Sequence, residues 1–255
     1  MIDQKFMQTW KNKTIPDNWK YSGPSIKKYM KNYQYYLMTD QDNLNLVKTY
    51  FPDFYSRFVN FKYDIMRADA IRYIWLYLNG GIYMDLDFYL KKDLSELIDR
   101  NKKLVFLEYQ SVHGKKYTNS LMMSEKYHPF WLMVIDEMKK EKPWRFLKSQ
   151  EVYETTGPYF LTGVIEKYIN KYGDKDIQIL KFEEIVSGEN SLDNSLDNSL
   201  DNSLENQSKY IQAVEGRSWH GNLERIGVFC HRNYQIILIF LLLVVILYVW
   251  YRRYL

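Results

Sequence analysis

Two aspartates, Asp85 and Asp87, stand one residue apart at the end of an apolar run. The run Ile82–Asp87 alternates Ile, Met and Leu with Tyr and the two Asp, which predicts a strand with both carboxylates on one face. Carboxylates held this close raise each other's pKa, and a divalent cation removes that penalty. Hard oxygen ligands suit Mn²⁺ or Mg²⁺, which can neutralise a departing diphosphate. The spacing predicts a metal site; the alternative is a strand end with two solvated acids.

A second pair, Asp69 and Arg72, lies just before this run. Apolar residues at helical spacing over 63–79, followed by Gly80-Gly81, predict a helix that ends at the glycines. Residues i and i+3 share one face of a helix, so Asp69 and Arg72 are neighbours there. The pair is either a structural salt bridge or, next to two acids at a strand end, a holder of sugar hydroxyl groups.

The elements that must position these residues alternate along the chain. Short aromatic or apolar runs predict strands at 5–10, 35–39, 82–87, 104–109 and 177–182. Helical patterns fall at 25–32, 42–50, 63–79, 129–140 and 158–172. Such alternation predicts an α/β domain with a mainly parallel central sheet.

Composition excludes several classes of protein. The chain has 255 residues, of which 46% are hydrophobic and 26% charged, as in a globular protein. Its net charge of +4 gives no case for nucleic acid as a partner. One cysteine and four histidines exclude an intramolecular disulfide and a zinc finger. The aromatic share of 17% suits a large core and a site that stacks on ring-shaped ligands.

The central stretch resembles a known family. The runs over 67–73 and 78–87, RADAIRY and LNGGIYMDLD, are similar to the sugar-binding region of Asp-x-Asp glycosyltransferases. The resemblance is greatest to the retaining family of fungal α-mannosyltransferases and inositol phosphoceramide mannosyltransferases. Four further segments agree in order, at 6–11, 36–40, 156–162 and 218–220. Met7 departs from the pattern, because the family usually has His there.

The resemblance implies a single domain of the glycosyltransferase-A type and a role for each matched residue. Asp87 would bind the metal directly, and Asp85 would contact the ribose and the water shell of the metal. Asp69 and Arg72 would contact the transferred sugar, and His220 would close the metal site. The remaining donor-binding candidates are Trp10, Tyr83, Asn119 and Trp219. Without the resemblance, His220 is equally a surface histidine, and Trp10 and Trp219 are equally core residues.

The implied reaction is the metal-dependent transfer, with retention, of a hexose from a nucleotide sugar to an acceptor hydroxyl. Mannose is the favoured sugar and a membrane glycolipid such as an inositol phosphoceramide the favoured acceptor. One alternative is transfer from a UDP-hexose to a protein-linked glycan. Another is a membrane-anchored carbohydrate-binding domain without turnover. A phosphatase is disfavoured, since its Asp-x-Asp would stand near the start of the chain.

The C-terminal part of the chain predicts a membrane anchor. Residues 234–251 form an uncharged stretch of about 18 residues, which as a helix would be about 27 Å long and could cross a bilayer. Aromatic residues and Arg252-Arg253 follow, as at a membrane interface. The alternative is a buried core helix. We expect a single-pass protein of an endomembrane, anchored at its C-terminal end.

Residues 191–206 repeat Ser-Leu-Asp-Asn three times and then read Ser-Leu-Glu-Asn. This composition favours turns and solvent, so 187–208 is interpreted as a low-complexity insertion in a surface loop. The expected organisation is a catalytic domain over 1–228 that contains this insertion, followed by the transmembrane helix at 234–251.

Overall fold

A computed structural model describes residues 1–111, 114–141, 145, 147–187 and 209–214. In this part of the chain, a six-stranded sheet has the order β2-β1-β3-β6-β5-β7. Its strands are β1 (Lys5–Thr9), β2 (Gln34–Met38), β3 (Gly81–Met84), β5 (Leu104–Ser111), β6 (Gly114–Ser124) and β7 (Ile177–Lys181). Strand β6 runs antiparallel to both of its neighbours, whereas the other pairings are parallel. The predicted α/β class and mainly parallel sheet are confirmed.

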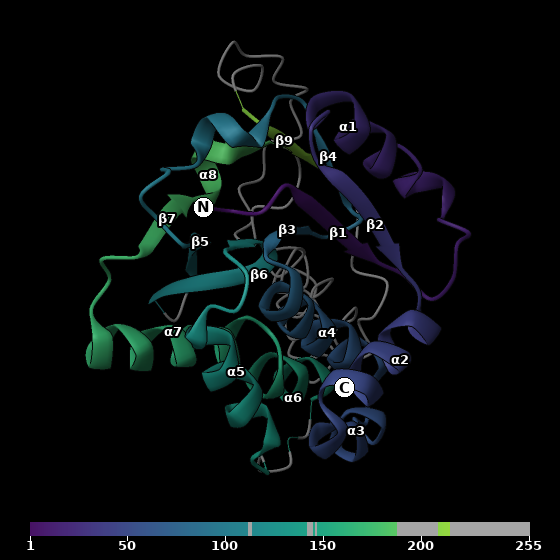
Figure 1. The fold of residues 1–255 in the computed structure, drawn as a ribbon, viewed down its shortest axis with the longest axis vertical. Coiled ribbons are helices and arrows are strands. Elements are labelled where there is room, and N and C mark those ends of the chain that lie inside the picture. The colour runs from purple at the N-terminus through teal and green to yellow at the C-terminus, as the bar shows by residue number, and fades with distance from the viewer. Residues whose placement is uncertain (112–113, 142–144, 146, 188–208, 215–255) are drawn as a thin grey trace, which may run out of the picture.

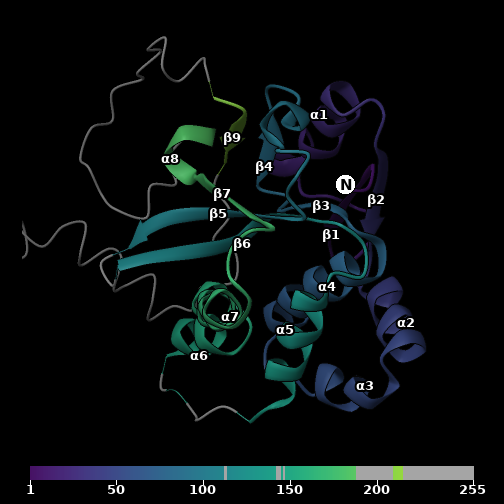
Figure 2. The same cartoon turned by 60° about the vertical axis from the view of Figure 1, so that its left-hand side comes forward.

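Helices cover one face of this sheet and a smaller layer covers the other (Figures 1 and 2). The helical layer holds α2 (Asp40–Tyr50), α3 (Pro52–Val59), α4 (Asp64–Asn79), α5 (Pro129–Lys139), α6 (Lys148–Thr155) and α7 (Pro158–Tyr172). The smaller layer holds α1 (Ser22–Tyr29), α8 (Phe182–Ile185) and a three-stranded sheet of order β4-β9-β8. Its strands are β4 (Phe88–Leu90), β8 (Val186–Ser187) and β9 (Ile211–Ala213). Two short 3-10 helices are η1 (Asp17–Trp19) and η2 (Leu94–Leu97).

The central strands are apolar on both faces, because both faces are covered. In β3, Tyr83 packs into the core under the helices, while Ile82 and Met84 pack into the core under the smaller layer. In β1, Met7 packs into the core under the helices, and Phe6 packs into the core under the smaller layer. Met7, where the related family usually has His, is fully buried in the helical core, so this position serves packing here.

Most predicted elements match the structure within a few residues, but several short elements were not predicted, and neither were α3, α6 and β6. Helix α3 is short and separated from α2 by Phe51 alone, and α6 is rich in polar residues. Strand β6 begins with polar residues and becomes apolar only from Leu121, so it shows no alternating pattern at its start. The predicted anchor at 234–251 and the repeat at 191–206 lie outside the described residues. Among the described helices, none is long and apolar enough to span a membrane.

Candidate active site

The Asp-x-Asp pair lies in a turn, and not in a strand as predicted. Strand β3 ends at Met84, and the N–H of Phe88 donates to the carbonyl of Asp85 across 3.3 Å. The N–H of Asp85 donates to the carbonyl of Ser120 in β6, across 2.8 Å. Strand β3 therefore ends where its hydrogen-bond ladder with β6 ends. A turn at the carboxyl end of β3 then brings the two carboxyl groups together. This is the edge of a parallel sheet where ligands usually bind.

Two glycines make the turn from α4 into β3. Gly80 and Gly81 have φ of 64° and 87°, a region that L side chains rarely adopt. A Cβ at Gly81 would lie 2.3 Å from the backbone carbonyl oxygen of Lys5. The chain can thus turn from the helix directly into β3 beside β1, and the middle of α4, which carries Arg72, lies next to the Asp-x-Asp turn.

Arg72 of α4 joins the helix to that turn. Its guanidinium contacts Asp69 across 3.1 Å and Asp85 across 3.0 Å. It also donates to the carbonyl of Asn119 across 2.8 Å and lies 4.6 Å from the ring centre of Tyr83. The side chains of Arg72 and Asp69 are 4% and 5% exposed. The predicted i, i+3 pair is therefore a buried ion pair that also holds Asp85.

Asp69 has hydrogen-bond partners at both carboxylate oxygens. Asn119 of β6 donates its amide to Oδ1 across 2.9 Å, and the hydroxyl of Thr156 donates to Oδ2 across 2.9 Å. The hydroxyl of Tyr73 donates to the carbonyl of Thr156 and accepts from Asn119. Burial raises the pKa of Asp69 to about 6, while Arg72 and these hydrogen bonds lower it. Asn119, predicted as a donor-binding residue, lies in β6 and donates a hydrogen bond to Asp69.

Asp85 is oriented from two sides. The hydroxyl of Tyr83 donates to Oδ1 of Asp85, and the buried amide of Gln8 donates to the carbonyls of Met84 and Asp85 across 3.3 and 3.1 Å. The hydroxyl of Tyr35 donates to the amide oxygen of Gln8 across 3.0 Å. Tyr83 is 2% exposed, so this donor-binding candidate acts here on Asp85. Burial raises the pKa of Asp85, against the lowering effects of Arg72 and the Tyr83 hydroxyl.

Asp87 differs from the other carboxyls in one respect. Its Oδ1 atom is buried and has no hydrogen-bond partner among the described residues. Burial and the neighbouring charge of Asp85 raise the pKa of Asp87 to about 7. A buried carboxylate without a partner is costly, and a cation is the partner that restores its charged form. This oxygen therefore fits the predicted role of a ligand to a hard divalent ion.

The remaining candidates lie around this group or beyond the described chain. Trp10 follows β1 at the same sheet edge, packs edge-to-face on Trp19 at 5.0 Å, and has the ammonium of Lys11 over its ring. Trp219 and His220 lie outside the described residues. Within the described ranges, no three His, Cys, Asp or Glu side chains are grouped to hold a metal.

Sequence reasoning missed Thr156, Tyr73 and Gln8. Thr156 stands in the quoted segment at 156–162, but no role was attached to it. Tyr73 was one residue of the central run. A polar residue inside an apolar strand is the available signal for Gln8, which is fully buried among apolar neighbours in β1.

Comparison with known proteins gives a consistent result. Residues 16–104 match the family model described as glycosyltransferase sugar-binding region containing DXD motif. A mannosyl phosphorylinositol ceramide synthase of Saccharomyces cerevisiae is 33% identical over 66% of this chain and 43% of its own length. Inositol phosphoceramide mannosyltransferase 1 of Schizosaccharomyces pombe is 27% identical over 94% of this chain and 69% of its own length. The chain thus spans less than half of the first relative.

A solved structure titled PaToxG Glycosyltransferase superposes with a TM-score of 0.49 and 18% identity, over 68% of this chain and 71% of that one. The matched range 16–104 contains Asp69, Arg72, Asp85 and Asp87, the carboxyl and guanidinium groups that the fold brings to one sheet edge. Residues 16–104 of this chain therefore match the glycosyltransferase sugar-binding region that contains the DXD motif, and Asp85-Leu86-Asp87 is an Asp-x-Asp sequence within that range.

Proposed function

We propose that the protein is a metal-dependent retaining glycosyltransferase. It transfers a hexose, with mannose favoured, from a nucleotide sugar to a hydroxyl group of a membrane glycolipid. The names of the curated relatives support an inositol phosphoceramide as the acceptor and mannose as the sugar. The observation that carries the proposal is the unpartnered, buried Oδ1 of Asp87 beside Asp85.

The charges of the site favour a bound cation. Asp69, Asp85 and Asp87 face one guanidinium, that of Arg72, so their ionised forms leave an excess of negative charge. Burial is the main cause of the raised pKa values of these carboxyls, and the charge of Asp85 adds to the rise at Asp69 and Asp87. Mn²⁺ or Mg²⁺ bound by Asp87, with Asp85 close by, would supply positive charge to the diphosphate of a donor.

His220 is proposed as a third ligand. The N–H of Val214 donates to the backbone carbonyl of Asp87 across 2.8 Å, so the described chain ends beside the DXD turn. His220 follows six residues after Val214. Six residues span at most about 20 Å when extended. The histidine is therefore within reach of Asp87, which supports the role that the family resemblance implies.

The chain's own residues fix the geometry of the proposed site. Tyr83 and Arg72 hold Oδ1 of Asp85, so its Oδ2 is the oxygen proposed to accept from a ribose hydroxyl. Asp69 and Arg72 are almost fully buried, so the structure supports a positioning role for both. Their direct contact with the transferred sugar stays a prediction. Fixed polar groups of this kind stabilise the positive charge that develops at the anomeric carbon.

Membrane attachment is part of the proposal. A helix over 234–251 would hold the domain over 1–228 at a bilayer of the endomembrane system. Tethering raises the effective concentration of the domain toward lipid head groups. A lipid acceptor is consistent with that arrangement and with the names of the two relatives.

The test is donor turnover by the full chain in lipid nanodiscs. GDP-mannose and common UDP-hexoses are supplied with Mn²⁺, with and without inositol phosphoceramide, and the anomeric configuration of the product is read by NMR. We expect chelator-sensitive transfer of one sugar with an α-linked product from an α-linked donor. Transfer that persists in full in Asp87→Asn, or that ignores the chelator, contradicts the proposed site.

A further inference from the structure

Gly163 occupies an unusual place in α7. It is the sixth residue of a helix of 15 residues, where glycine is less favourable than alanine. A Cβ built on Gly163 would meet no heavy atom within 4 Å beyond its own helix turns and chain neighbours. Close packing therefore does not require a glycine at this position. What the glycine does provide is open space above the middle of the helix.

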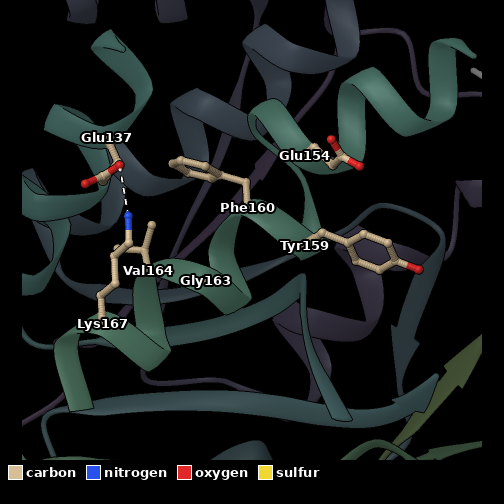
Figure 3. Close-up of a pocket in the computed structure, with 7 residues that line it drawn as sticks. All are labelled: Glu137, Glu154, Tyr159, Phe160, Gly163, Val164 and Lys167. Atoms are coloured by element: carbon tan, nitrogen blue, oxygen red, sulfur yellow. Dashed lines mark ion pairs between the residues drawn. The ribbon is translucent and has the colours of Figure 1, made fainter. Parts of the chain in front are cut away.

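That space belongs to a hollow of about 580 Å³, here called the Gly163 groove. Its walls include Tyr153 and Glu154 of α6, Tyr159, Gly163 and Glu166 of α7, and Lys116 of β6. A volume of this size lies within the range of small-molecule sites, about 300–1,000 Å³. A smaller hollow of about 190 Å³ shares Glu154, Tyr159 and Gly163 with it and continues to the ion pair of Lys167 with Glu137 (Figure 3).

The chemistry of the walls selects a kind of ligand. The rings of Tyr153 and Tyr159 lie 5.5 Å apart and form an apolar wall, with the ammonium of Lys116 5.8 Å from the Tyr159 ring centre. Glu154 is paired with Arg145 across 2.6 Å, and Lys116 and Glu166 carry one charge of each sign. The walls are thus electrically balanced, which disfavours an anion. Aromatic surface with carboxylate and ammonium groups suits a neutral ring bearing several hydroxyl groups.

The groove and the candidate active site are both formed in part by residues at the junction of α6 and α7. A Cβ at Gly157 would lie 3.0 Å from Cα of Tyr153, so the two helices meet tightly there. Thr156, the residue before Gly157, donates to Asp69. Tyr159, a wall of the groove, follows three residues after Thr156. The same short segment therefore holds the proposed sugar site on one side and forms the groove on the other.

We propose that the Gly163 groove binds a neutral six-membered polyhydroxylated ring, a hexose or cyclitol, as part of the acceptor. The ring would lie against Tyr153 and Tyr159 over the open backbone of Gly163. The claim that this ring belongs to the acceptor rests on the proposed glycosyltransferase function, whereas the claim that the groove binds a ring does not.

The experiment measures ring binding to the full chain in nanodiscs by saturation-transfer NMR. The probes are methyl α-mannoside and myo-inositol, which distinguish a hexose from a cyclitol, and inorganic phosphate tests for an anion. Gly163→Leu fills the groove and should weaken binding of the preferred ring at least tenfold. Asn170→Leu adds the same side chain at an exposed position of α7 and should leave binding unchanged.

Gly163→Ala is a second test of the groove, for use if the leucine variant does not fold. It should raise the melting temperature by about 2–4 °C, because alanine is the better helix former and meets open space. It should also weaken ring binding about threefold. The proposal is overturned if neither ring binds, if phosphate alone binds, or if both Gly163 variants bind the ring as the unaltered chain does.

The two proposals fail separately. If no donor turns over with Mn²⁺ but ring binding responds to Gly163→Leu, the groove stands and the transferase function fails. If donor turnover depends on metal but ring binding ignores Gly163, the function stands and the groove assignment fails. Where both hold, Gly163→Leu should raise the KM for the acceptor at least tenfold and change metal-dependent donor hydrolysis by less than twofold.

Discussion

Asp69 and Asp87 are carboxyl groups close to the same guanidinium, yet their surroundings differ. Asp69 receives hydrogen bonds at both oxygens from Asn119 and Thr156 and touches Arg72. Asp87 has a buried Oδ1 with no partner in the described part of the chain. Burial raises the pKa of both, to about 6 for Asp69 and about 7 for Asp87. Both carboxylate oxygens of Asp69 thus have partners within the protein, whereas Oδ1 of Asp87 has none among the described residues.

This contrast predicts which property each carboxyl group affects, stability or activity. A completed buried ion pair is often no more stabilising than well-packed apolar residues, but breaking it leaves an uncompensated charge. An incomplete carboxyl instead weakens the metal-free protein and gains when a cation binds. Substitutions on the two sides should therefore act on different quantities, stability on the Asp69 side and activity on the Asp87 side.

The largest expected effect is on activity, in Asp87→Asn. Loss of the ligand charge should lower metal-dependent transfer by about 10³-fold, which corresponds to several kcal/mol of lost charge stabilisation. The melting temperature of the metal-free protein should stay the same or rise, because the repulsion with Asp85 is removed. Donor turnover and thermal melting measure the two quantities. A fall in both would show that Asp87 is a structural group like Asp69.

On the other side, Arg72→Met should mainly lower stability. It leaves Asp69 and Asp85 without their buried cation, which should cost about 3–5 kcal/mol in the free energy of unfolding. The matched control is Arg67→Met on the same helix, whose partner Asp64 is exposed, and it should cost less than about 1 kcal/mol. Denaturant titration of both variants checks this. Equal losses would mean that burial of the Arg72 ion pair has no energetic role.

A smaller effect is expected for Thr156→Val. The variant keeps the shape of the side chain but leaves Oδ2 of Asp69 without its donor, at a cost of about 1–3 kcal/mol. The pKa of Asp69 should rise above about 6, as followed by NMR titration of its carboxyl carbon. Thr155→Val is the control, because its hydroxyl has no described hydrogen bond. If the two variants differ in stability but the pKa of Asp69 does not change, a loss of packing and not of the hydrogen bond explains the difference.

The stability of the metal-free protein should also depend on pH. Because the folded-state pKa values of Asp69 and Asp87 lie above the usual 3.8, the folded protein binds more protons between about pH 4 and 7. These groups therefore make the metal-free protein less stable as pH rises through that window. Mn²⁺ should reverse the trend, since it competes with the proton on Asp87. Melting curves from pH 4.5 to 7.5, with Mn²⁺ or with chelator, test the sign.

The sequence predicted much of this arrangement, for identifiable reasons. Strong periodicity located α4 and α7, and the glycine pair marked the end of α4. The spacing of Asp69 with Arg72 and of Asp85 with Asp87 identified the residues that meet at the site. These are local patterns, and local patterns survive folding where the elements are long and regular.

What the sequence did not show depends on contacts between distant residues. Thr156 and Asp69 are separated by 87 residues and Gln8 and Asp85 by 77, so no window along the chain contains both partners. The turn at Asp85 was predicted as strand because its residues alternate as strand residues do. The antiparallel β6 ends the ladder at that point through Ser120, and no local pattern indicated this.

The backbone bond between Val214 and Asp87 also has a mechanical meaning. Strand β9 is the middle strand of its sheet, between β4 and β8, and β4 begins at the residue after Asp87. A pull on the chain beyond Val214, directed along β9, loads the bonds of these ladders in shear, so that they share the load. Tension applied to the chain beyond Val214 would therefore be borne next to the DXD turn.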